Sequence, residues 1–225
     1  MPSSVDPAPY PGRLRWARLG AWAGALPLAG YLVLHLATQA STFAGARSYA
    51  RITRAIDALP ALIVLEIVVI YLPLLFHVGA SVLGLREPED DIEGGLSGPW
   101  GRRLQVTSGA VLLLFLIFHF WQFRWRLWAG DLARSDFYPE LCASLSSTSF
   151  GGVPLVAMAY LVGIAAAAFH GAQGVHRVAV GWDMMRGRQR LLARCCGALG
   201  VGLFLLGALI VIDLATGSVL IHFPG

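Results

Sequence analysis

Four histidines are the residues of this sequence whose type and spacing could do chemistry: His35, His77, His119 and His170. Each lies in a different long apolar stretch, and an ionisable side chain within a membrane is costly enough to indicate a function by default. Neutral imidazole is a good iron ligand, and two histidines that face each other from different helices can hold a b-type haem. For any single histidine the alternative is a hydrogen bond to a neighbouring helix. Four of them, one per stretch, favour haem ligation.

The depths of these histidines predict how they pair. His77 and His170 lie nine and seven residues from the nearest arginine at one end of their stretches, about 10–13 Å at the helical rise of about 1.5 Å per residue. His35 and His119 lie seventeen and sixteen residues from the arginines at that same end, about 24–26 Å. We therefore expect an inner pair, His77 with His170, and an outer pair, His35 with His119, each holding one haem b. Zinc is disfavoured because layers about 13 Å apart cannot share one tetrahedral ion.

The elements that must position the histidines are five apolar helices. Of the 225 residues, 56% are hydrophobic and 13% are charged, about half the charge of an ordinary soluble domain. With a mean hydropathy of +0.65, this composition excludes a soluble enzyme and a disordered protein. The apolar stretches are continuous rather than alternating and reach the roughly 20 residues that a bilayer core requires, so they predict helices and not strands. The expected spans are about 17–39, 58–85, 104–125, 153–177 and 195–220.

We therefore predict an all-α membrane protein in which four haem-binding helices form a bundle with a fifth. Residues 13–225 form one transmembrane domain, and residues 1–12, rich in Pro and Ser, form a disordered N-terminal cap. The three cysteines form no CxxC or CxxCH pattern, so neither covalent c-type haem nor a cysteine zinc site is expected.

All 17 basic residues are arginines, and their distribution predicts the orientation. The N-terminus and the second and fourth loops hold 11 of them, whereas the first and third loops hold 6, with Arg124, Arg126 and Arg134 counted in the third loop. Because cytoplasmic loops are enriched in basic residues, we expect a multi-pass protein of a bacterial cytoplasmic (inner) membrane with its N-terminus in the cytoplasm and its C-terminus outside. Acidic residues are scattered among the arginines, so no nucleic-acid partner is expected.

Two arginines are candidates for contacts with haem propionates. Arg126 follows His119 by seven residues and Arg177 follows His170 by seven, so each is expected on the helix face of its histidine. The alternative is that these arginines only set the topology. Small residues near the histidines would let a flat macrocycle approach the backbone, or would serve ordinary helix packing. They are Gly30, Gly79, Gly109, Gly163, Gly171 and Gly174.

Three stretches carry a resemblance to a known family. They are LEIVVIYLPLLFHVGASVLG (65–84), QVTSGAVLLLFLIFHFWQFRWR (105–126) and MAYLVGIAAAAFHGAQGVHRVAVGW (158–182). They resemble the cytochrome b subunit of succinate dehydrogenases and fumarate reductases, in the branch with one five-helix anchor that carries two haems. The resemblance covers roughly residues 14–220, and the 42-residue intervals from His35 to His77 and from His77 to His119 match the rhythm of that family.

The resemblance implies that His77 and His170 hold a proximal haem and that His35 and His119 hold a distal haem. It implies a complex with an iron-sulfur subunit, which faces the proximal haem, and with an FAD-carrying flavoprotein subunit that interconverts succinate and fumarate. Electrons would pass through the two haems to menaquinone near the distal haem. The chain would thus be part of an enzyme without binding succinate itself.

Two features depart from the family pattern. Some fumarate reductases of this type carry a proton-transferring glutamate two residues before the proximal ligand of the fourth helix, a position that is Ala168 here. Their proton path is therefore not expected in this chain. The third loop, around residues 131–149, is longer than in compact relatives, and the sequence predicts no function for it.

Two carboxylates are candidates for a quinone site. Reduction of a quinone consumes protons, so the site needs a titratable group within reach of the quinone oxygens. Glu66 and Asp213 are the only carboxylates within the predicted spans, and both are expected on the side of the outer histidine pair. A hydrogen bond across helices is the alternative for each.

Two other functions remain open. One is a di-haem cytochrome b that serves a hydrogenase or a formate dehydrogenase, which a co-purifying partner would reveal. The other is a haem-free transporter or structural anchor, which would show no reduced b-type absorbance. The number of haems per polypeptide is the most informative measurement.

Overall fold

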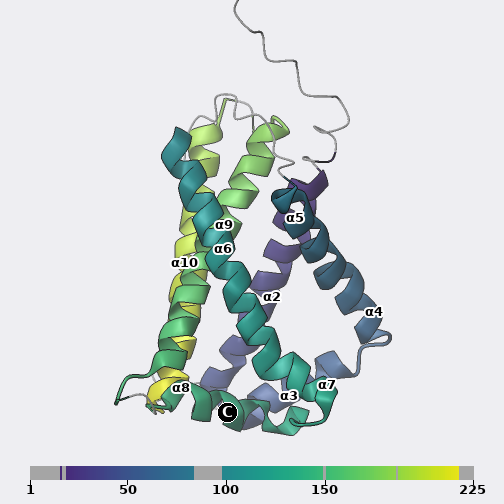
Figure 1. Ribbon diagram of the computed structural model, residues 1–225, viewed down its shortest axis with the longest axis vertical. Coiled ribbons are helices and arrows are strands. Elements are labelled where there is room, and N and C mark those ends of the chain that lie inside the picture. The colour runs from purple at the N-terminus through teal and green to yellow at the C-terminus, as the bar shows by residue number, and fades with distance from the viewer. Residues whose placement is uncertain (1–15, 17–18, 84–97, 149–150, 186, 218–225) are drawn as a thin grey trace, which may run out of the picture.

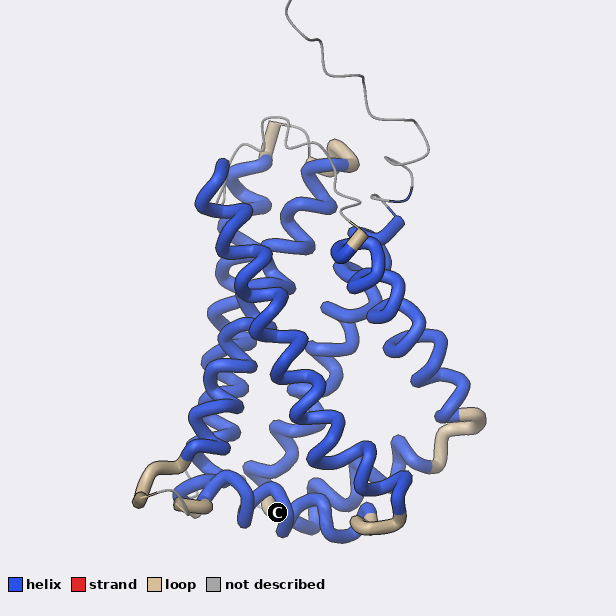
Figure 2. Tube along the Cα trace, in the orientation of Figure 1, coloured by secondary structure: helices blue, strands red, loops and turns tan. Residues whose placement is uncertain are grey.

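The computed structural model describes residues 16, 19–83, 98–148, 151–185 and 187–217 (Figure 1). The described residues form helices joined by short turns, with no strand among them, as Figure 2 shows. The predicted all-α fold is therefore confirmed. The expected disordered cap at residues 1–12 and the end of the fifth expected span, at residues 218–220, lie outside the described residues.

Five helices in the described part of the chain are long and apolar enough to cross a membrane, as predicted. They are Leu19–Ala44, Leu62–Val82, Trp100–Ala129, Leu155–Gly181 and Gln189–Thr216. The third continues to Ala129, where Gly130 ends it in a left-handed conformation (φ 82°) that glycine adopts without strain. Arg124 and Arg126, which the sequence analysis counted as loop residues, therefore lie inside this helix, and their assignment to the third loop was wrong.

The first three spans are built from several helical segments each. The first contains η1 (Gly24–Leu28), α2 (Ala29–Gln39) and η2 (Ala40–Ala44). The second contains α4 (Leu62–Glu66), η3 (Ile67–Tyr71) and α5 (Leu72–Val82). The third contains α6 (Gly98–His119), η4 (Phe120–Trp125) and α7 (Arg126–Ala129). The fourth and fifth are the continuous helices α9 (Leu155–Gly181) and α10 (Gln189–Thr216).

Three of these segments, η1, η3 and η4, are π-helical, the wider turn that often marks functional sites. Two of them coincide with prolines: Pro27 lies inside η1, and Pro73 lies in the first turn of α5, directly after η3. Proline has no N–H and its ring clashes with the carbonyl four residues earlier, so the regular α-helical ladder cannot continue through it. No proline lies in η4.

The bundle is centred on α9. Helices α6, α9 and α10 run side by side, while α4 and α5 diverge from them and α2 passes between the two groups (Figure 1). The face of α9 toward its neighbours is made of small residues such as Gly163, Ala167 and Ala168, which are buried. Small residues allow close helix approach in membrane proteins. Ala168 contributes no titratable group at the position of the family's glutamate.

Two short helices lie across one end of the bundle: α3 (Ala46–Asp57) and α8 (Phe137–Ser146) (Figure 1). On α8, Leu141 and Leu145 are buried in the apolar core and the helix packs against α10. The long third loop therefore contains a helix that covers this end of the bundle.

Large apolar side chains cover the outside of the spans. Leu34, Ile63, Leu75 and Leu114 are each more than 60% exposed, and all belong to the membrane-length helices. A soluble domain seldom exposes contiguous apolar surface of this extent. The distribution fits contact with lipid.

Candidate functional site

The structure brings the four membrane histidines together in two pairs. The ring centres of His35 and His119 are 5.8 Å apart, and those of His77 and His170 are 6.0 Å apart. In both pairs the imidazole planes meet at 78°. These are the outer and inner pairings that the residue depths predict, and each joins two helices that are not consecutive in the chain.

Each histidine of the inner pair is oriented by a backbone carbonyl. The Nδ1 atom of His77 lies 3.0 Å from the carbonyl oxygen of Gly20, and that of His170 lies 3.0 Å from the carbonyl oxygen of Gln105. A carbonyl oxygen can only accept, so Nδ1 carries the hydrogen in both rings. The Nε2 lone pair of each ring is then available for a metal, which is the usual arrangement of a ligating histidine.

In the outer pair, His119 is oriented by a side-chain relay. Its Nδ1 lies 3.0 Å from the hydroxyl of Tyr160, which donates a 2.8 Å hydrogen bond to Oε1 of Gln122. The single hydroxyl hydrogen is used by Gln122, so Tyr160 accepts from His119, and Nε2 of His119 again keeps its lone pair. Both Tyr160 and Gln122 are buried. The other member of the pair, His35, stacks on Tyr31 with ring centres 5.6 Å apart.

Glycines make room for these rings. A Cβ atom at Gly24 would collide with the His77 ring, and one at Gly109 would lie 2.8 Å from Cε1 of His170. Beside the outer pair, a Cβ at Gly163 would collide with Phe115, whose ring stacks on His119. Side chains larger than hydrogen at these positions would displace the imidazoles or the ring that supports one of them.

The two pairs fit haem better than they fit a free metal ion. Two metal–nitrogen bonds of about 2 Å, plus about 1 Å from each nitrogen to its ring centre, place axial imidazoles about 6 Å apart. No group of three or more His, Cys, Asp or Glu side chains within the described residues could hold a metal ion. A haem requires only two protein ligands because its macrocycle supplies the other four.

One curated protein that is similar in sequence is the succinate dehydrogenase cytochrome b558 subunit of Bacillus subtilis (strain 168). The two sequences are 26% identical over 168 residues, which make up 74% of this chain and 79% of the relative. The chain is therefore similar to that cytochrome b subunit over most of its length. No family model and no solved structure matches the chain.

The resemblance to succinate dehydrogenase cytochrome b subunits is thus confirmed, and the five apolar helices fit the membrane anchor of such a complex. The five apolar helices and this similarity together indicate a multi-pass membrane protein.

The two propionate candidates lie in different surroundings. Arg126 forms an ion pair with Glu140 of α8, with Nη1 and Oε1 2.6 Å apart. The π-helical segment η4 lies between His119 and Arg126, so the ideal spacing that predicted a shared helix face does not apply there. Arg177 follows His170 along the continuous helix α9, where that spacing holds.

The two carboxylates proposed for a quinone site are not brought together. Glu66, at the end of α4, forms an ion pair with Arg124 of η4. Asp213 is buried on α10, where its charge adds to the effect of burial in raising the pKa of Tyr138 on α8. Glu66 thus lies between the second and third spans, whereas Asp213 lies near α8.

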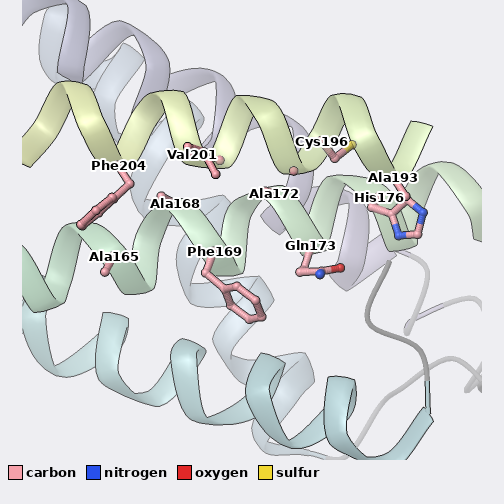
Figure 3. A pocket seen from close by; sticks show the side chains of 12 residues that line it. Ala165, Ala168, Phe169, Ala172, Gln173, His176, Ala193, Cys196, Val201 and Phe204 are labelled. Carbon is pink, nitrogen blue, oxygen red and sulfur yellow. The ribbon is translucent and has the colours of Figure 1, made fainter. Parts of the chain in front are cut away.

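A cavity of about 370 Å³ lies between α9 and α10 (Figure 3). Its walls are apolar except near Gln173 and His176, and the Nε2 atom of His176 is buried without a hydrogen-bond partner in the described structure. Because His176 lies six residues beyond His170, it is on a different face of α9 from the inner pair. The cavity is thus separate from both histidine pairs.

Several residues of the site were not found from the sequence: Gly20, Gly24, Tyr160, Gln122 and Arg124. The carbonyl of Gly20 has no signature in a sequence, because any residue carries one. Tyr160 and Gln122 had a usable signal, since both are polar residues inside predicted spans that contain a histidine. Arg124 was missed because it was counted among the arginines of the third loop.

Proposed function

We propose that this chain is the membrane anchor and electron-transfer subunit of a succinate:quinone oxidoreductase, with one haem b at the inner pair and a second at the outer pair. The single observation that carries the proposal is the double histidine pairing, with ring centres 6.0 and 5.8 Å apart. In the inner pair and at His119 the Nδ1 atoms are already engaged by protein acceptors. The similarity to a succinate dehydrogenase cytochrome b558 subunit supports the choice of complex.

The residues of the chain hold, orient and shield the two sites. His77 and His170 would ligate the inner haem, and His35 and His119 the outer one, each through Nε2. The hydrogen bonds at Nδ1 fix the tautomer and the ring orientation, and they raise the basicity of the ligating nitrogen. When bound, the haems supply one-electron transfer between the two membrane surfaces.

The overall reaction balances across the complex. Oxidation of succinate to fumarate in a flavoprotein subunit releases two electrons and two protons, and reduction of menaquinone to menaquinol takes up two electrons and two protons. The electrons would enter this chain from an iron-sulfur subunit beside the inner pair and leave near the outer pair. The N-terminus would lie in the cytoplasm and the C-terminus outside. Arg126 and Arg177 remain candidates for propionate contacts, and Glu66 and Asp213 for proton transfer.

Haem titration of the purified protein tests this function. We expect two haems per polypeptide and a reduced b-type spectrum. His77→Ala or His170→Ala should remove one haem and leave the outer one, and His35→Ala or His119→Ala should do the reverse. Absence of haem would instead support a haem-free anchor or transporter.

The choice of complex is tested by the subunits that co-purify from native membranes. We expect a flavoprotein and an iron-sulfur subunit together with succinate-dependent quinone reduction. Co-purification with a hydrogenase or a formate dehydrogenase would refute the assignment to succinate oxidation and retain the di-haem function.

A further inference from the structure

Arg124 and Glu66 form an ion pair between two membrane-length helices. Nη2 of Arg124, from η4 in the third span, contacts Oε2 of Glu66, from α4 in the second span. The two side chains are 15% and 19% exposed. Charged groups at such positions are expensive and usually serve a function. Each also adjoins a π-helical segment, because η3 begins directly after Glu66 and η4 contains Arg124.

Aromatic rings adjoin Arg124 and connect it to the outer histidine pair. The guanidinium of Arg124 lies 5.4 Å from the ring centre of Trp128, and Tyr71 contacts Trp128 with ring centres 6.3 Å apart. Tyr31 interacts electrostatically with Arg124 and stacks on His35. The set of Arg124, Glu66 and these rings, which we call the Arg124 cluster, therefore adjoins the outer pair and combines flat apolar walls with charged groups.

The guanidinium of Arg124 has one N–H group that is not hydrogen-bonded to any described residue. Its Nε atom is buried and has no hydrogen-bond partner within the described part of the chain. Guanidinium carries five N–H donors, and a buried N–H without an acceptor is destabilising, more so when the group is charged. A bound molecule with an oxygen acceptor would satisfy it.

We propose that Arg124 is a quinone-binding residue: its Nε–H donates to a quinone carbonyl oxygen while Nη2 holds Glu66 beside the same headgroup. The inference rests on the proposed function and deepens it. A quinone ring is flat and apolar with acceptor oxygens at opposite edges, so it matches aromatic walls that contain one unpaired donor. Succinate is a dianion, so the carboxylate of Glu66 would repel it.

The same arrangement serves the chemistry of reduction. As two electrons from succinate reach the quinone, negative charge develops on its oxygens, and a preorganised guanidinium stabilises that charge. Glu66, which the same guanidinium contacts, supplies a titratable group beside that oxygen. Two protons then pass in turn through Glu66 to the oxygens and form the two O–H bonds of the quinol. Water supplies these two protons.

The test uses the intact complex in detergent, with Arg124→Gln as the main variant and Arg51→Gln as the matched control, since Arg51 is an exposed arginine of α3. Two activities are measured with succinate: reduction of dimethylnaphthoquinone, and reduction of phenazine methosulfate, which takes electrons before they reach this chain. Binding of the quinone analogue heptylhydroxyquinoline N-oxide is followed by fluorescence quenching.

We expect Arg124→Gln to raise the KM for dimethylnaphthoquinone and the Kd for the analogue by about tenfold or more, because a hydrogen bond to a charged donor is lost. Phenazine methosulfate reduction and haem content should stay unchanged, and Arg51→Gln should behave as wild type. Arg124→Lys should recover part of the binding, because lysine restores the charge but not the planar fork. Unchanged KM and Kd in Arg124→Gln would overturn the proposal.

A double variant distinguishes loss of folding from loss of quinone binding. If Arg124→Gln loses haem because Glu66 is left unpaired, Arg124→Gln with Glu66→Gln removes both charges and should restore haem content. Wild-type analogue binding in that double variant would also overturn the proposal. If the wild-type complex does not reduce quinone from succinate, the proposed function fails, whereas a Kd that depends on Arg124 would still uphold a quinone-type site.

Discussion

The hydroxyl of Tyr160 accepts a hydrogen bond from Nδ1 of His119, at a distance of 3.0 Å, and passes its own hydrogen to Gln122. This relay connects α9 to the third span at the outer histidine pair. It is the side-chain counterpart of the carbonyl contacts that orient the inner pair.

Tyr160→Phe should therefore weaken haem binding at the outer pair alone. The substitution leaves the Nδ1–H of His119 and the buried amide of Gln122 without their partner, and loss of such a supporting contact typically costs 10–100-fold in metal affinity. We expect haem content to fall from two toward one after dilution and washing, with the spectrum of the inner haem retained. Tyr138→Phe, on α8, is the matched control and should keep both haems.

Gly109→Ala should disturb the inner pair. The added Cβ would lie 2.8 Å from Cε1 of His170, closer than real Cβ contacts allow, so the ring must shift. Gly79→Ala is the control, because a Cβ there meets no atom within 4 Å and alanine is the better helix former. Haem titration and the reduced absorbance spectrum compare the two variants. Equal haem content in both would show that the close approach at Gly109 does not position the ligand.

The 78° angle between the imidazole planes predicts the magnetic signature of both ferric haems. Axial imidazoles in nearly perpendicular planes give a strongly anisotropic low-spin signal, whereas parallel planes give a rhombic one. Electron paramagnetic resonance of the oxidised protein should therefore show two strongly anisotropic signals. A rhombic signal would mean that the rings rotate when haem binds.

Arg126 and Glu140 should shift the potential of the outer haem in opposite directions. If Arg126 lies near a propionate, Arg126→Ala removes a positive charge and stabilises the ferric form, so the potential falls, while Glu140→Gln raises it. For an interaction of about 1 kcal/mol, typical of a partly exposed pair, the shift is some tens of millivolts, because tenfold corresponds to about 59 mV for one electron. Redox titration measures both. If neither variant moves the potential, Arg126 serves only to dock α8 through Glu140.

The five spans and the pairing of the histidines could be predicted because they depend on the number of residues in each apolar stretch and on the position of each histidine within it. A bilayer requires a minimum length of apolar helix, and charged residues mark where each helix ends. The rise per residue then converts position into depth, so His77 could be matched with His170 and His35 with His119. Deviations of a few residues in the helix ends leave the layers intact because they are separated by several turns.

The contacts around the histidines could not be predicted in the same way. The acceptor of the His77 hydrogen bond is a backbone carbonyl 57 residues away, which depends on how two helices pack. The helix α8 was treated as part of a loop because Ser144, Ser146 and Ser147 indicated one, although Leu141 and Leu145 of this helix are buried in the core. Arg124 was placed outside the membrane because an arginine was taken as the end of a span, although a partner such as Glu66 on the next helix allows a charge to lie within it.

The π-helical segment η4 divides the third span into two parts whose side chains are rotated relative to each other about the helix axis. A π-turn contains one residue more than the α-turn that it replaces, so the residues beyond it are rotated by about 100° relative to an uninterrupted helix. Before η4, α6 sets the direction of His119, and within η4 the extra residue turns Arg124 toward Glu66. Deletion of a single residue from 120–125 would restore an ordinary α-helix and leave His119 in place, yet it would carry the guanidinium away from its carboxylate. The number of residues in η4 thus determines whether Arg124 reaches Glu66.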